Sequence, residues 1–220
     1  MEKPLTIRIE DFGVRVVSVW EGLRPATRGL VERALVSAQA PTTAGATGAS
    51  RRAGATLYDA RAEWELSRLL AALDDRAMEA GVAALSGEQI LELKRMAETC
   101  ALVLHNEAHS AETFAQLLER ALRARNYARV DALADTLAAH LAPSEICELA
   151  RHPAPAVRAI AQEALLQMPT PMLVSLLSDP VDMDVARDAL ERQAEEYGSE
   201  EASWIVSALE RADAAEEDDM

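Results

Sequence analysis

The chain has 220 residues, a formal net charge of −15 and an apolar fraction of 50%, but only 4% of its residues are aromatic. This length is sufficient for a sizeable core, and the abundance of alanine and leucine favours helices. The acidic balance disfavours general binding to nucleic acid or to anionic membranes. The sequence contains no run of about 18 uncharged apolar residues, so no membrane-spanning helix is expected.

The N-terminal residues have the alternating pattern of β-strands. Apolar and polar residues alternate over residues 5–9, and residues 14–20 are rich in valine. Because Asp11-Phe12-Gly13 lies between them as a turn, we expect a β-hairpin. Phe12 and Trp20 are candidate anchors for a partner, since aromatic side chains are scarce in this chain.

Four segments are expected along the chain. Residues 1–39 contain the hairpin and a short helix over residues 30–36. Residues 40–56 have no large apolar side chain and predict a flexible linker. Residues 57–213 are expected to form a helical domain, and residues 214–220 an acidic tail.

Start signals predict several helices in the body. Residues 57–81 and 90–108 have helical apolar spacing, and the second follows a capping box in which Ser86 precedes Gln89. Further starts are expected at Ser110, at Ser144 after Pro143, at Thr170-Pro171 and at Ser199.

A repeat organises the second half of the chain. Leucine is followed eight residues later by valine three times, and the valines are Val130, Val157 and Val185. An alanine stands four residues after each valine, and the spacings between the valines are 27 and 28 residues. Fixed spacing of this kind is typical of stacked helical units, which bury their apolar faces against one another.

The repeat resembles HEAT-like repeats over about residues 118–197, most clearly in Pro155-Ala-Val157-Arg158. Val130-Asp131 and Val185-Ala186 match the Val-Arg pair of that family only in part. The resemblance implies a superhelix whose second helices line its inner face. The expected fold is therefore all-α, a short HEAT-like solenoid with an N-terminal β-hairpin.

Arginines concentrate within this repeat. Arg125, Arg129, Arg151 and Arg158 are expected to lie on the solenoid surface and to contact a partner. The leading hypothesis is a non-enzymatic protein-interaction module, which also agrees with the absence of a catalytic motif. Nucleic-acid binding through the arginines is the alternative, and intramolecular ion pairing would leave them without such a role. Self-association through the hairpin edge is compatible with each hypothesis.

A second alternative is metal binding. His105 and His109 lie four residues apart in a predicted helix, which places them on one face. They also stand near the expected helix end, where histidines commonly cap carbonyl groups. No cofactor is expected. Cys100 and Cys147 are expected as buried thiols in a reducing compartment, which together with the lack of a signal-peptide core indicates the cytoplasm.

Overall fold

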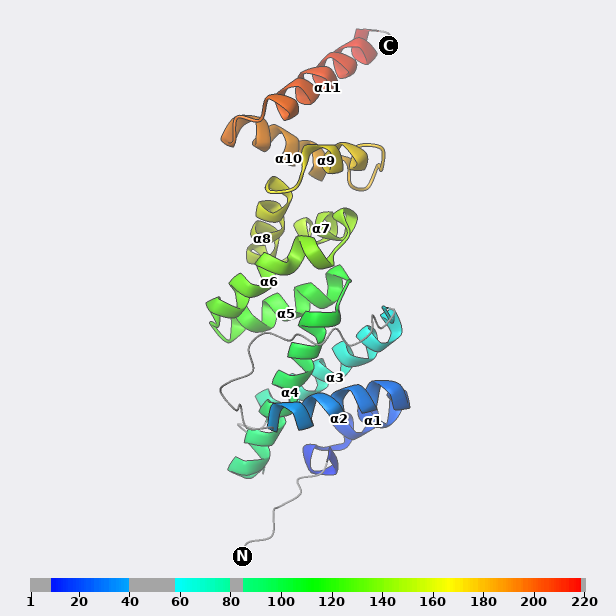
Figure 1. The fold of residues 1–220 in the computed structure, drawn as a ribbon, viewed down its shortest axis with the longest axis vertical. Coiled ribbons are helices and arrows are strands. Elements are labelled where there is room, and N and C mark those ends of the chain that lie inside the picture. The colour runs from blue at the N-terminus through cyan, green and yellow to red at the C-terminus, as the bar shows by residue number, and fades with distance from the viewer. Residues whose placement is uncertain (1–8, 40–57, 80–84, 219–220) are drawn as a thin grey trace, which may run out of the picture. The chain divides into compact units, whose positions relative to one another are not determined.

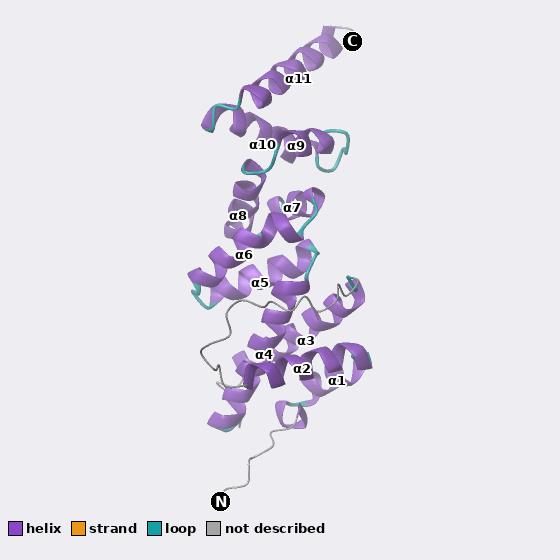
Figure 2. Ribbon diagram, viewed as in Figure 1, coloured by secondary structure: helices purple, strands orange, loops and turns teal. Residues whose placement is uncertain are grey.

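A computed structural model describes residues 9–39, 58–79 and 85–218 of the chain (Figure 1). These residues form eleven α-helices and one 3-10 helix, and they contain no strand (Figure 2). The all-α class is therefore confirmed. The chain divides into two compact units between Ala108 and His109. Within the described ranges, no helix is long and apolar enough to cross a membrane.

The first unit contains the 3-10 helix η1 (Ile9–Phe12) and four α-helices. These are α1 (Val14–Gly22), α2 (Pro25–Gln39), α3 (Ala60–Glu79) and α4 (Gly87–Glu107). α1 packs against α3, α3 against α4, and α2 against α4. The core of this unit includes Leu66, Leu69 and Leu70 of α3, which are almost completely buried.

The predicted β-hairpin is wrong. Residues 14–20, expected as its second strand, lie in helix α1, and most of the first expected strand falls outside the described residues. The segment satisfies the helical period as well as the strand period: Val16 is buried, and Val19 and Trp20, three and four residues later, are half-buried. Packing of this apolar stripe against α3 needs no partner strand, whereas an isolated hairpin is marginal.

The other N-terminal predictions have different outcomes. The helix expected over residues 30–36 is part of the longer α2. The expected linker, residues 40–56, lies outside the described residues. The helices expected over residues 57–81 and 90–108 correspond to α3 and α4. The capping box is confirmed, because Ser86 Oγ accepts from Gln89 N–H and the Gln89 side chain accepts from Ser86 N–H.

A buried carboxylate connects the α1–α2 corner to α3. The Glu65 side chain is 4% exposed and accepts hydrogen bonds from Thr27 Oγ1 at 2.5 Å and from Arg24 Nε at 3.0 Å. Arg24 Nη2 also donates to Asp59 Oδ2 at 2.8 Å. Asp59 Oδ1 in turn accepts from the N–H groups of residues 61 and 62 and so caps the start of α3.

The second unit contains seven helices. They are α5 (Ala111–Arg123), α6 (Tyr127–His140), α7 (Pro143–Ala150), α8 (Pro155–Leu166), α9 (Thr170–Leu176), α10 (Met183–Glu196) and α11 (Glu200–Asp218). The expected helix starts after Ser110 and Ser199 and at Pro143 and Thr170 all occur. α11 extends to Asp218 and so includes most of the segment expected as an acidic tail.

Helices of the second unit pack in sequential pairs. α5 packs against α6, α7 against α8, and α9 against α10. Each pair also contacts the next one: α5 contacts α7, α7 contacts α9, α6 contacts α8, and α8 contacts α10. Val130 and Val157 are buried in the second helices of their pairs, as the repeat predicts. In the third pair Val185 is half-buried and its neighbour Ala186 is buried instead, so the core position shifts by one residue.

Candidate functional site

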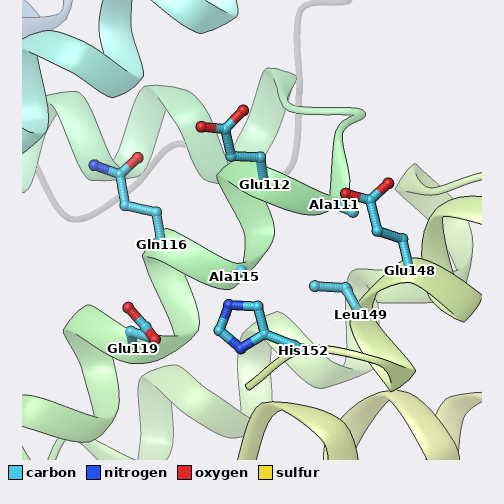
Figure 3. Close-up of a pocket in the computed structure, with 8 residues that line it drawn as sticks. All are labelled: Ala111, Glu112, Ala115, Gln116, Glu119, Glu148, Leu149 and His152. Carbon is cyan, nitrogen blue, oxygen red and sulfur yellow. The ribbon is translucent and has the colours of Figure 1, made fainter. Parts of the chain in front are cut away.

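A hollow of the second unit lies between α5 and α7 and has a volume of about 320 Å³ (Figure 3). We call it the α5–α7 groove. It is lined by residues of α5, by the C-terminal end of α7 and by the corner that follows. These residues are Ala111, Glu112, Ala115, Gln116, Glu119, Glu148, Leu149 and His152. Side chains far apart in the sequence therefore face one small volume.

Local helix geometry places these side chains. Ala111, Ala115 and Glu119 recur every four residues along α5, which puts them on one face of that helix. Ser110 Oγ caps the start of α5 by accepting from Thr113 N–H at 3.3 Å. Glu145 of α7 accepts from Ala111 N–H, and this bond joins the two helices at one end of the groove.

The groove has an apolar floor and an acidic rim. Ala111, Ala115 and Leu149 are buried and supply the floor. The carboxylates of the rim belong to three glutamates: Glu112 and Glu148 are exposed, and Glu119 is half-buried. None of these three forms an ion pair with another described residue. Their carboxylates therefore give the groove a negatively charged rim.

His152 adds a hydrogen-bond donor to the groove. Its ring lies beside Ala115 in Figure 3. The Ala154 N–H group donates to His152 Nδ1 at 3.2 Å, so Nδ1 acts as an acceptor. Nε2 is therefore the ring nitrogen that remains to act as a donor.

Two of the predicted arginines bind within the protein. Arg151 Nη2 lies 2.9 Å from Asp182 Oδ1, and Arg151 Nη1 donates to the Val181 carbonyl at 3.0 Å. Arg158 Nη1 donates to the carbonyl oxygens of His152 and Pro153 at 2.9 and 2.8 Å. These bonds close the α7–α8 corner and connect it to the α9–α10 corner. Intramolecular ion pairing, one of the outcomes considered for this arginine group, therefore applies to Arg151, whereas Arg158 binds backbone carbonyl groups instead.

The other two predicted arginines lie at the α5–α6 connection. Arg125 is exposed and has a positive φ of 53° in the turn between the helices. Arg129 is half-buried in the first turn of α6, where its own N–H donates to the side chain of Asn126. A partner-binding role for Arg125 and Arg129 stays a prediction.

Neither of the two predicted aromatic anchors has a fully exposed side chain. Phe12 is 1% exposed in η1, so the expectation of an exposed anchor is wrong at this position. Trp20 is half-buried on α1. The more exposed aromatic residues are Trp204 and Tyr127, at 78% and 65%. Trp204 precedes Ile205 in a helix, so apolar spacing alone did not distinguish it from a core residue.

The histidines considered for metal binding do not share a helix. α4 ends at Glu107, so His105 is helical and buried whereas His109 lies beyond the helix and is exposed. The His109 ring lies 5.7 Å from the ring of His140, centroid to centroid. Within the described residues, no three His, Cys, Asp or Glu side chains gather in an arrangement that would hold a metal ion.

Both cysteines are buried free thiols, as expected. Burial raises the pKa of the Cys147 thiol to about 11, and the nearby Asp182 carboxylate contributes in the same direction. Cys147 is therefore a neutral core residue at neutral pH.

Comparison with protein-family models, curated proteins and solved structures finds no match to this chain. The chain is accordingly described by its architecture, an all-helical protein whose helices pack in sequential pairs.

Proposed function

We propose that this protein is a non-enzymatic protein-interaction module that binds a partner in the α5–α7 groove. The single observation that carries the proposal is the groove itself, an open hollow of about 320 Å³ with an apolar floor and unpaired carboxylates at its rim. Hollows that combine apolar surface with a few polar groups are the usual places where proteins take up a ligand or a partner side chain.

The proposal includes a short solenoid of HEAT-like repeats. It is supported by the contacts between pairs, because first helices pack on first helices and second helices on second helices from α5 to α10. The 27-residue spacing of the buried valines Val130 and Val157 supports it too. A surface built from successive pairs suits an extended partner, since it presents equivalent positions one after another.

Nucleic-acid binding receives less support from the contacts. Arg151 and Arg158 donate to groups of the protein itself, and the groove carries carboxylates that repel phosphate. The partner we propose is therefore a protein.

The test is capture of partners by tagged full-length protein from native lysate, with and without nuclease. Ala115→Leu fills the floor of the groove, and Gln116→Trp covers its mouth in case the first variant loses stability. Ala128→Leu is the matched control, because Ala128 is exposed on α6 outside the groove. Circular dichroism checks that each variant is folded.

We expect a protein that survives nuclease, that binds the wild type and Ala128→Leu equally, and that is lost from both groove variants. Equal capture by all four proteins would remove the groove from consideration. Capture that disappears entirely with nuclease would favour nucleic-acid binding.

A further inference from the structure

We infer that the occupant of the α5–α7 groove is an extended, arginine-bearing segment of the partner protein. The inference rests on the proposed function and names the chemistry of its ligand. It follows from three properties of the groove: the sign of its rim, the size of its floor and the donor on His152.

The rim selects positive charge. Glu112, Glu119 and Glu148 line the hollow, and none of the three forms an ion pair with a described cationic side chain. The net charge of −15 adds a long-range field of the same sign. The rim carboxylates and the net charge both repel an acidic segment or a phosphate group, and both attract a cation.

The floor selects a long side chain with an apolar stem. The side chains of Ala111 and Ala115 end at Cβ and leave the space above them open. The groove that they line has a volume of about 320 Å³. The methylene groups of arginine or lysine can cover such a surface while the charged head reaches the rim. Arginine fits better than lysine, because its planar guanidinium group donates paired hydrogen bonds to carboxylates.

The donor selects a peptide backbone beside that side chain. His152 lines the groove with Nδ1 already accepting from Ala154 N–H, so Nε2–H is the ring group that can donate to a ligand. The side chains of arginine and lysine have no acceptor for it. A backbone carbonyl of the same segment supplies one. An extended peptide presents its carbonyl groups and side chains together, which a free cation or a polyamine does not.

The inference is tested by fluorescence anisotropy with a labelled peptide of alternating alanine and arginine, six residues long. Peptides with lysine or glutamate in place of arginine are the comparisons. The groove variant carries Glu112→Gln, Glu119→Gln and Glu148→Gln. The control variant carries Asp131→Asn, Asp135→Asn and Glu195→Gln, which changes the net charge equally at exposed positions outside the groove.

We expect the arginine peptide to bind the wild type more tightly than the lysine peptide, and the glutamate peptide not to bind. The groove variant should weaken binding of the arginine peptide by about tenfold, which corresponds to about 1.4 kcal/mol, and the control variant by less than about threefold. His152→Phe should also weaken binding of the arginine peptide relative to wild type, because a backbone carbonyl of the peptide loses its hydrogen-bond donor.

Equal weakening by the two triple variants would overturn the inference, since net charge alone would then explain binding. Failure of the arginine peptide to bind would also overturn it. If the natural partner is lost from Ala115→Leu but kept by the groove carboxylate variant, the proposed function stands and only the arginine-bearing ligand is rejected.

Discussion

Arg151 and Asp182 join two corners of the second unit through an ion pair of 2.9 Å between Nη2 and Oδ1. The Asp182 side chain is only 5% exposed, whereas that of Arg151 is 37% exposed. Arg151→Leu would leave a buried carboxylate without its counter-ion. We expect the free energy of unfolding to fall by about 1–3 kcal/mol, less than for a fully buried pair because water screens the arginine.

A double-mutant cycle with Asp182→Asn isolates this pair. The double variant should lose less stability than the sum of the single variants, since removing both charges leaves no unpaired ion. Strict additivity in denaturant titrations would show that the ion pair contributes nothing to stability.

Gln193 is expected to be a large single contributor to stability at the α8–α10 contact. Its side chain is buried, and Nε2 donates to the carbonyl oxygens of Leu166 and Met168 at 2.9 and 2.7 Å. Gln193→Leu keeps the approximate volume but leaves two buried acceptors unsatisfied. We expect a loss of about 2–4 kcal/mol by chemical denaturation. Thr170→Val, which removes only one bond to Gln193, should cost about 1 kcal/mol, and an equal loss in both variants would contradict this account.

The first unit should lose stability in acid through Glu65. Burial by itself raises the pKa of Glu65, but hydrogen bonds from Thr27 and from Arg24 together lower it below its ordinary value of 4.5. Because the folded-state pKa is lower than the unfolded one, the stabilisation is present above pH 4.5 and is lost as pH falls through the folded value. The hydrogen-exchange protection of α3, corrected for the slower intrinsic exchange in acid, should therefore fall between pH 7 and about pH 3.

Glu65→Gln removes this titration. Its α3 should exchange faster than the wild type at neutral pH, and the difference between the two should shrink in acid. Glu88→Gln, at an exposed position of α4, should follow the wild type throughout. If the α3 protection of Glu65→Gln differed from that of wild type by the same amount at every pH, Glu65 would not be the group responsible for the loss of stability in acid.

Cys100 and Cys147 should resist alkylation in the native protein. Both side chains are buried, and a pKa of about 11 for Cys147 leaves roughly one thiolate in a thousand at pH 8. Mass spectrometry after iodoacetamide treatment should show no modification in the native state and two modified cysteines in guanidinium. Rapid labelling of Cys147 without denaturant would reveal local opening of the core around α7.

Helix starts were predictable because their signals are local. The Ser86 capping box and the Ser110 cap act within four residues of chain, and Pro143 fits the first turn of a helix in any fold. The repeat predicted the buried position at the start of each second helix to within one residue. Its third unit deviates because Ala186, rather than Val185, fits against the neighbouring helices, and one residue rotates a helical side chain by about 100°.

The candidate groove was not predictable in the same way. Glu112, Glu119 and Glu148 look like ordinary solvated positions in the sequence, and only packing of α5 against α7 brings them around one hollow. The arginines were predicted as a site because they are numerous in this region. Arg151 instead binds Asp182 in the distant α9–α10 corner, and Arg158 binds a carbonyl group of the irregular α7–α8 corner.

The sequence by itself determined the helical class, the capped helix starts and the paired repeat, because these depend on propensity and on contacts a few residues apart. Tertiary structure alone decided whether residues 14–20 became strand or helix, since Val16 and the residues around it suit both periods. A strand needs a partner to satisfy its backbone, whereas a helix satisfies its own and needs only an apolar surface such as α3 to cover one face.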